Sequence, residues 1–420
     1  MKKILAALSF LFTLVPKQIY AQDTSVVNRI KQHIYFLASD ALEGRQTGSH
    51  GEEMARNYLL EYYEKNLPKA TATVQQFTFS VKANPHDTIA KNNLVNDKPA
   101  YNVASFIDNG ADYTIIIGAH YDHLGYGEYG SSLYAGTDKL IHNGADDNAS
   151  GTAAILEIAQ ELCAKSNTKK MNYNYLILHF SGEELGLYGS KYAAEHLAEL
   201  NFFNGKAPKI NCMINLDMVG RLQKDGGLSV SGVGTSPTFK RVLNNIKSDS
   251  FTVKLSESGV GPSDHTSFYL KNSPVLFLFS GTHSDYHKPS DDAEKINYKG
   301  EANIIAYTMR ILDSLDACAP MLFTATKNED NKETPKFKVT LGIMPDYVYS
   351  GEGVKVDGVS EGKVGASAGI QTGDIITKIN GDKTKDIYEY MAALAHLKKG
   401  DKARIEVIRA GKKVKLDAQF

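Results

Sequence analysis

The stretch GADDNASG, residues 144–151, places two adjacent aspartates, Asp146 and Asp147, among small residues. It leads directly into a segment with helical periodicity, from about residue 150 to residue 164. A carboxylate held on a tight turn can contact two cations at once, and the N-terminus of the following helix favours negative charge. We therefore expect the other metal-binding residue types of the chain to gather around this turn.

Apolar, β-branched runs lie on both sides of this turn and alternate with helical patterns. Strands are predicted at 71–80, 101–107, 113–118, 173–180, 210–216, 228–230 and 274–279. Helices are predicted at 24–38, 52–65, 150–164, 185–200, 236–248, 264–270 and 304–316. Residues 81–100 are polar and predict a loop. The alternation predicts an α/β domain with a mixed, mostly parallel sheet sandwiched by helices.

Metal-binding residue types stand where the predicted strands end. His120 follows the first central strand, Glu183 and Glu184 follow the next, and Asp217 follows the third. His287 lies in the loop after the last strand. Because active sites in such sheets lie beyond the carboxyl ends of the strands, we expect these side chains to meet. Imidazole and carboxylate ligands together suit zinc.

Two short motifs refine this interpretation. In His120-Tyr-Asp122, the carboxylate two residues on is placed to accept the second N–H of a ligand imidazole and fix its tautomer. In Glu183-Glu184, one glutamate can bind metal while its neighbour moves protons. Taken alone, adjacent aspartates most often form a solvated turn, and adjacent glutamates often start a helix. The complete set of residues favours the metal-site interpretation.

Several residues compete for these functions. His123, His142, His265 and His283 are alternative ligands. Gly281, Ser284 and Pro289 argue against a helix that would pair His283 with His287. We therefore expect His287 to bind metal and His283 to lie at the rim or to face the substrate. The alternatives stay open for Asp264 with His265 (outer shell or structural), for Arg221 (substrate contact or salt bridge) and for the loop 125–143 (lid or surface loop).

Five segments in this order resemble the signature segments of the M28 family of di-zinc peptidases: GAHYDHLG, GADDNASG, FSGEELGLYGS, NLDMVGRL and SDYHKPSDD. The resemblance covers residues 24–317. It implies that one zinc ion is bound by His120 and Asp217, that the other is bound by Glu184 and His287, that Asp147 bridges them, that Glu183 is the general base, and that Asp122 orients His120.

The resemblance implies a di-zinc metallopeptidase, most simply an aminopeptidase, that uses a metal-activated water and Glu183 as general base. The sequence does not separate an aminopeptidase from a carboxypeptidase or a dipeptidase. One alternative is a glutaminyl cyclase-like acyltransferase of the same fold with a single zinc, against which the five ligands argue. The other is a non-catalytic peptide-binding protein in which the peptidase domain serves as a scaffold.

The C-terminal part has its own pattern of short strands, turns and one helix. Residues 336–420 resemble a PDZ domain, with Leu341-Gly-Ile-Met344 matching the carboxylate-binding loop. The expected ligand is a peptide C-terminus or an extended strand that joins the sheet, and the alternative is that the domain packs over the catalytic cleft. A charged segment, KNEDNKETP at 327–335, precedes it. The predicted organisation is a signal peptide at 1–21, a peptidase domain at 22–320, a linker at 321–335 and the PDZ-like domain at 336–420.

Composition sets the remaining limits. The 420 residues carry a formal net charge of -1, which gives no reason to expect a nucleic acid partner. Lys2, Lys3 and the apolar run Ile4 to Val15, too short to span a bilayer, predict an export signal cleaved after Ala21, with a periplasmic or extracellular destination. The three cysteines lack CxxC spacing and are expected to be buried small hydrophobes.

Overall fold

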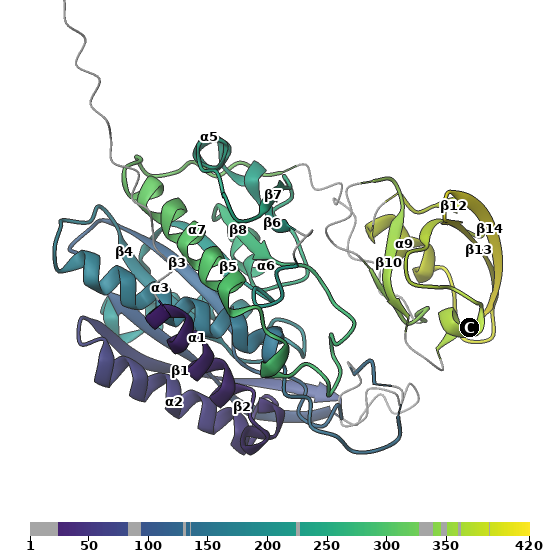
Figure 1. Cartoon of the computed structure of the whole chain (residues 1–420), viewed down its shortest axis with the longest axis horizontal. Helices are drawn as coiled ribbons and strands as arrows, with labels where there is room; N and C mark the ends of the chain where they lie inside the picture. The colour runs from purple at the N-terminus through teal and green to yellow at the C-terminus, as the bar shows by residue number, and fades with distance from the viewer. Residues whose placement is uncertain are drawn as a thin grey trace, which may run out of the picture.

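The computed structural model describes residues 24–82, 94–128, 132–134, 136–223, 227–326, 339–345, 351–359, 363–385 and 387–420. The predicted signal peptide lies outside these residues. Their buried side chains form cores in an α/β domain and a separate core in a smaller, β-rich C-terminal domain. Figure 1 shows the helices and strands of both domains. No helix among the described residues is long and apolar enough to cross a membrane.

An eight-stranded sheet with the order β1-β2-β4-β3-β5-β8-β6-β7 forms the centre of the α/β domain. Its strands are β1 (Ala70–Lys82), β2 (Leu94–Ile107), β3 (Tyr113–His120), β4 (Asn174–Phe180), β5 (Lys209–Leu216), β6 (Gly227–Ser231), β7 (Thr252–Leu255) and β8 (Val275–Phe279). The four central strands β4, β3, β5 and β8 are parallel, whereas β1, β2 and β6 join by antiparallel pairing. The predicted mixed, mostly parallel sheet is confirmed.

Helices cover both faces of this sheet. They are α1 (Thr24–Leu37), α2 (His50–Asn66), α3 (Gly151–Ser166), α4 (Tyr188–His196), α5 (Pro237–Asn245), α6 (His265–Tyr269) and α7 (Tyr298–Asp316). Side chains of α1, α2, α3, α5 and α7 share one core cluster, and those of α4 and α6 share the other. Strand β3 contributes side chains to both clusters, because successive side chains of a strand point to opposite faces of the sheet. Ile115 and Ile117 belong to the cluster of α1, α2, α3, α5 and α7, and Ile116 belongs to the cluster of α4 and α6.

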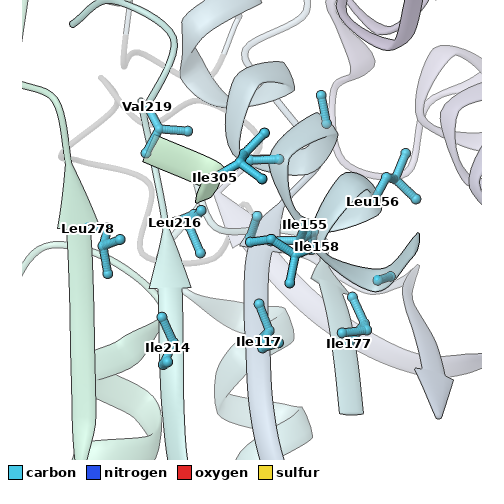
Figure 2. Close-up of a cluster of buried hydrophobic side chains, with 14 of the residues drawn as sticks. Ile117, Ile155, Leu156, Ile158, Ile177, Ile214, Leu216, Val219, Leu278 and Ile305 are labelled. Atoms are coloured by element: carbon cyan, nitrogen blue, oxygen red, sulfur yellow. The ribbon is translucent and has the colours of Figure 1, made fainter. Parts of the chain in front are cut away.

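The larger cluster lies directly below the candidate site. Figure 2 shows Ile117, Ile177 and Ile214 of three neighbouring strands beneath Ile155 and Ile158 of α3. All five side chains are fully buried. This packing fixes the start of α3, and with it the turn at 144–151, over the carboxyl ends of the parallel strands.

Two sequence predictions need correction in this domain. Residues 81–100 were expected to form a loop, but β1 extends to Lys82 and β2 begins at Leu94, which pairs with Lys82. The pairing continues along both strands with one irregularity between Phe79 and Val81, and residues 83–93 lie outside the described residues. Backbone pairing with a long neighbour outweighs the polar composition there. Strand β7 was not predicted, because its side chains are mostly exposed and leave no apolar pattern.

Two helices also differ from prediction in extent. The helix expected at 185–200 begins at Tyr188 and ends at His196, and 3-10 turns follow. Helix α7 begins six residues before the predicted start, at Tyr298, because the side chain of Asn297 caps it by accepting from the N–H of Gly300 (2.9 Å).

The C-terminal domain contains β9 (Ile343–Pro345), β10 (Val354–Val359), β11 (Ile375–Ile379), β12 (Asp382–Lys383), β13 (Lys402–Arg409) and β14 (Lys412–Gln419) in antiparallel pairing. It also contains α8 (Val364–Ser367) and α9 (Ile387–Ala395), so the predicted single helix is accompanied by a four-residue turn of helix. The first residues of the predicted linker pack on the α/β domain, where the Met321 N–H donates to Asn211 Oδ1 (2.7 Å).

Truncation of the core below the site should destabilise the α/β domain. We expect Ile117→Ala to lower its free energy of unfolding by about 2–5 kcal/mol, because the buried side chain leaves a cavity that the sheet cannot fill. Ile117→Val should cost about 0.5–1.5 kcal/mol. Chemical denaturation followed on the transition of this domain measures both. Equal stability of Ile117→Ala and the wild type would contradict the packing described here.

Candidate metal centre

The turn between β3 and α3 has irregular backbone where the predicted bridging residue stands. Residues Ala145–Ser150 form a π-helical turn that is interrupted at Asp147 and Asn148, whose dihedral angles are not helical, and the peptide bond between these two is cis. Helix α3 starts at Gly151, where a Cβ atom would lie 2.4 Å from the Leu216 carbonyl oxygen. Glycine therefore allows the start of α3 to sit directly on the end of β5.

Asp146 is a structural anchor of this turn. It is fully buried, and its Oδ1 accepts from the Gly220 N–H (2.7 Å) and the Ser150 hydroxyl (3.0 Å). Its Oδ2 lies 3.1 Å from His283 Nε2. The prediction that His283 lies at the rim or faces the substrate is wrong, because its ring is almost completely buried and pairs with Asp146. Burial opposes the charge of His283, but the pairing with Asp146 raises its pKa.

Asp291 anchors the turn from the other side. Its Oδ2 accepts from the backbone N–H groups of Asp146 (2.9 Å) and Asp147 (3.1 Å). Burial and the neighbouring Asp146 raise the pKa of Asp291 to about 6. Arg221, which was left between substrate contact and salt bridge, pairs with Asp285 at 3.1 Å. Residues outside the predicted ligand set thus determine how Asp147 is presented.

The two oxygens of Asp147 face two different histidine–carboxylate pairs. Oδ1 lies 3.3 Å from His120 Nε2, which in turn lies 3.5 Å from Asp217 Oδ1. Oδ2 lies 3.1 Å from His287 Nε2, which lies 3.2 Å from Glu184 Oε2. The structure therefore brings all five predicted ligands together, with the Asp147 carboxylate between the two pairs.

Buried polar atoms without a hydrogen-bond partner indicate which kind of ligand this cluster binds. His120 Nε2 and Asp217 Oδ1 are buried and have no hydrogen-bond partner among the described residues. Buried polar atoms are normally paired, so two such atoms on facing ligand types indicate a cation site. The nitrogen and carboxylate donors match zinc. The residues present therefore fit the metal ions that the sequence predicts.

Two of the three predicted carboxylate ligands have a lowered pKa, whereas burial raises the pKa of the third, Asp217. Burial opposes the charge of Asp147, but contacts with His120 and His287 keep its pKa well below the usual value. Burial likewise opposes the charge of Glu184, yet His287 lowers its pKa to about 2. The ionised carboxylate is the form that binds a cation, and a lowered pKa favours that form.

Glu183 is in a different electrostatic situation. Burial raises the pKa of its carboxyl well above the usual value, against the opposing charge of His120, and Asp264 and Glu184 add to the rise. Its Oε2 lies 4.0 Å from His120 Nε2, beside the metal cluster and not within it. A carboxyl with a raised pKa next to the ligands has the properties of a general base.

Asp122 acts through both its backbone and its side chain. The His120 Nδ1 atom lies 3.2 Å from the Asp122 carbonyl oxygen and 3.7 Å from the Asp122 carboxylate, so the carbonyl is the nearer acceptor. The carboxylate accepts from the Glu183 N–H (3.1 Å) and from the Thr47 hydroxyl (2.8 Å). Asp122 therefore also fixes the backbone that carries the two glutamates.

The loop Ser181–Glu184 is held by residues that the sequence did not identify. The Ser181 N–H donates to Asn102 Oδ1 (3.0 Å), and its hydroxyl bonds Glu52. Burial and then the charge of Asp122 raise the pKa of Glu52 to about 8. No local sequence signal marks these positions, because both partners lie on elements distant in sequence.

Arg45 is a second anchor that the sequence did not reveal. It is completely buried, and its guanidinium donates to the carbonyl oxygens of Tyr121 (2.9 Å), Asn143 (2.7 Å) and Gly144 (3.1 Å). It therefore ties the end of β3 to the start of the 144–151 turn. A lone arginine in a glycine-rich segment predicts no such function.

The other histidines that compete for the ligand positions have different surroundings. His142 bonds the Ser132 hydroxyl (2.7 Å) and burial lowers its pKa to about 4, whereas His265 stacks on Phe277 at 4.5 Å. His123 contacts a predicted ligand, since its Nδ1 lies 2.8 Å from Glu184 Oε1. In the loop 125–143, whose described residues include Leu133, the Leu133 N–H donates to the His287 carbonyl (2.9 Å).

A small cavity of about 80 Å³ opens beside the cluster. Its polar wall is formed by Asp147, Glu183, Asp217 and His287. The rest of its lining is mostly apolar and consists of Met218, Pro262, Phe277, Phe279, Thr282 and Tyr286. The cavity therefore places charged groups against a surface that suits an apolar side chain.

Comparisons with known proteins agree with this geometry. The family model for "Peptidase family M28" matches residues 102–311, and that for "PDZ domain" matches residues 323–419. The chain is similar to leupeptin-inactivating enzyme 1 of Streptomyces exfoliatus (27% identity over 271 residues, 63% of this chain and 51% of that protein). It is also similar to aminopeptidase YwaD of Bacillus subtilis (28% over 205 residues, 46% and 40%).

Another relative is named for a different activity. Glutaminyl-peptide cyclotransferase of Drosophila melanogaster is 25% identical over 229 residues, 49% of this chain and 62% of that protein. The chain spans about half the length of these curated relatives. The LapA aminopeptidase structure of Legionella pneumophila has a TM-score of 0.52 at 20% identity, over 70% of this chain and 72% of that chain, which shows a shared fold.

The two aspartates of the turn should respond differently to substitution. Asp147→Asn should lose at least one of the two metal ions, because a neutral amide cannot bridge two cations. Asp146→Asn should keep both ions and instead lose about 1–3 kcal/mol of stability, because it disturbs buried hydrogen bonds. Metal analysis after desalting and thermal unfolding measure the two effects. The opposite pattern would show that Asp146 is the bridging residue.

Proposed function

The chain belongs to peptidase family M28, and from this we propose that it is a di-zinc metallopeptidase that removes N-terminal residues from peptides. The observation that carries the proposal is the position of Asp147 between two histidine–carboxylate pairs. His120 and Asp217 would hold one ion, His287 and Glu184 would hold the other, and the Asp147 carboxylate would contribute to both.

The residues of this chain have distinct tasks in the proposed reaction. Bound zinc would supply Lewis acidity toward the scissile carbonyl and toward the attacking water. Glu183, whose pKa is raised by burial, takes the proton from that water and returns it to the leaving amine. Asp122 holds the Glu183 backbone in place through the 3.1 Å hydrogen bond.

The shape of the cavity supports exopeptidase action at an N-terminus. The acidic residues on its polar wall can pair with a free α-ammonium group. The small size of the cavity suits a single side chain and not an extended peptide on both sides of the scissile bond. A carboxypeptidase would instead be expected to hold the terminal carboxylate of its substrate with a lysine or an arginine, and neither residue type lines this cavity.

The alternatives make different predictions for metal content and activity. A glutaminyl cyclase, the activity for which the Drosophila relative is named, would bind one zinc ion and convert N-terminal glutamine. A non-catalytic peptide-binding protein would bind metal and hydrolyse nothing. The two complete ligand sets favour the di-zinc peptidase over the first, and the position of Glu183 favours it over the second.

Glu183→Gln should separate catalysis from metal binding. We expect turnover of aminoacyl-p-nitroanilides to fall by about 10²–10⁴-fold, because the general base is lost, while the zinc content stays at two ions per chain. Glu195→Gln, at an exposed glutamate paired with Lys271, is the matched control and should retain wild-type rates. Near-wild-type activity of Glu183→Gln would place the base elsewhere.

The apolar wall of the cavity predicts side-chain preference. Substrates with an apolar N-terminal residue should be cleaved with higher kcat/KM than those with N-terminal Glu or Lys. Phe279→Ala should widen the cavity and shift the preference toward larger apolar residues by about 10- to 200-fold in relative kcat/KM. A panel of aminoacyl-p-nitroanilides measures this. An unchanged ranking in the variant would show that the N-terminal side chain binds elsewhere.

We propose that the PDZ domain binds peptide C-termini and recruits longer substrates. The support is the match of residues 323–419 to the PDZ model and the Leu341-Gly-Ile-Met344 sequence. Deletion of residues 327–420 should leave cleavage of short substrates unchanged and raise KM for long peptides. Steady-state kinetics on matched short and long peptides tests this, and equal KM values for both proteins would argue against recruitment.

We also propose that the protein is exported to the periplasm or outside the cell. The support is the basic residues Lys2 and Lys3 followed by a short apolar run. N-terminal sequencing of the mature protein would identify cleavage after Ala21.

A further inference from the structure

We propose that His123 is a positioning residue of the metal centre. Its Nδ1–H donates to Glu184 Oε1, so that Glu184 presents only Oε2 to the position it shares with His287 and Asp147. This inference rests on the proposed di-zinc centre and assigns a function to a histidine outside its five ligands.

The ring of His123 is held in one orientation by its surroundings. Its side chain is completely buried. The His123 N–H donates to the Arg45 carbonyl (3.1 Å), which fixes the backbone. A Cβ atom at Gly144 would lie 2.4 Å from His123 Cδ2, so the glycine gives the ring its space, and the His287 ring packs edge-on at 5.9 Å.

The two oxygens of Glu184 are divided between two imidazoles. Oε1 lies 2.8 Å from His123 Nδ1, which is an ordinary hydrogen-bond distance, and Oε2 lies 3.2 Å from His287 Nε2. Because one oxygen is engaged by His123, the carboxylate cannot rotate to offer both oxygens to a cation. Hydrogen bonds of this kind orient metal ligands and typically alter metal affinity.

The tautomer of His123 follows from its environment. A hydrogen bond to a carboxylate oxygen requires the proton on Nδ1. Nε2 is buried and has no hydrogen-bond partner among the described residues, so a proton on that nitrogen would be a buried donor without an acceptor. The tautomer with its proton on Nδ1 is therefore the one that fits these contacts.

The distances favour positioning over direct ligation by His123. Its Nδ1 lies 3.9 Å from the nearest Asp147 oxygen, whereas His287 Nε2 lies 3.1 Å from the same oxygen. His287 is thus the imidazole that shares a cation position with the bridging carboxylate. The alternative, that His123 is itself a ligand, is distinguished by experiment.

The test measures zinc affinity of the metal-free full-length chain by competition with a chromogenic chelator, for wild type, His123→Leu, His123→Asn and His123→Gln. The amide nitrogen of asparagine occupies about the place of Nδ1, whereas that of glutamine lies farther along the side chain. We expect His123→Leu and His123→Gln to lower the affinity for one of the two zinc ions by about 10- to 100-fold and to leave the affinity for the other unchanged. His123→Asn should restore the affinity to within a few-fold.

Cobalt substitution provides a second readout. Loss of the His123 hydrogen bond frees Oε1 of Glu184 to bind, which raises the coordination number and lowers the intensity of the visible cobalt bands. We expect this change in His123→Leu and His123→Gln but not in His123→Asn. His33→Leu removes a buried histidine of α1 and is the matched control, expected to show wild-type affinities and spectrum.

Each outcome has a definite meaning. Unchanged affinities in both His123→Leu and His123→Gln would overturn the inference while leaving the di-zinc centre intact. Equal losses in His123→Asn and His123→Gln would overturn positioning in favour of direct ligation. A wild-type chain that binds no zinc would refute the proposed function itself. The two polar variants keep the comparison valid even if His123→Leu fails to fold.

Discussion

The sharing of one carboxylate between two histidine–carboxylate pairs is the constraint on which this structure depends. Asp147 can face both His120 and His287 only if its backbone leaves regular helical geometry just before α3 begins. Burying several carboxylates in one place is costly unless each is paired with positive charge or a hydrogen-bond donor. The surrounding architecture can be understood as the means of keeping these groups close.

A continuous set of buried polar contacts supplies that means. Asp291 accepts the N–H groups at the start of the turn, and Asp146 ties the turn to the loop after β5. Arg45 links the same turn to the end of β3, and Asp122 links β3 to the glutamate loop. These residues hold backbone, while the proposed ligands use their side chains toward the cluster. Neighbouring residues such as Asp146 and Asp147 therefore differ in function although they are identical in chemistry.

The sequence predicts the centre of this arrangement well and its support poorly. The apolar run of β3 and its neighbours predicts parallel strands, and parallel topology alone brings His120, Glu184 and Asp217 to one edge of the sheet. The start of β2 and the edge strand β7 escape prediction because strand pairing, and not local composition, determines them. The burial of His283 and the contact between His123 and Glu184 depend on loops that meet only in three dimensions.

Burial of acidic groups at this site affects both the stability of the fold and the proposed activity. Glu52, Glu183 and Asp291 have raised pKa values for the same first reason, namely burial. A site that needs closely spaced acids is therefore a site where the fold loses stability, and this loss must be offset elsewhere. Burial of the large apolar cluster beneath α3 contributes stability that opposes this loss. The same cluster fixes the strand ends and the helix start that carry the site. Bound cations would add to the same balance, since ions that bind only the folded chain stabilise it. Core packing and metal binding thus both stabilise the folded chain against the repulsion between like charges around Asp147.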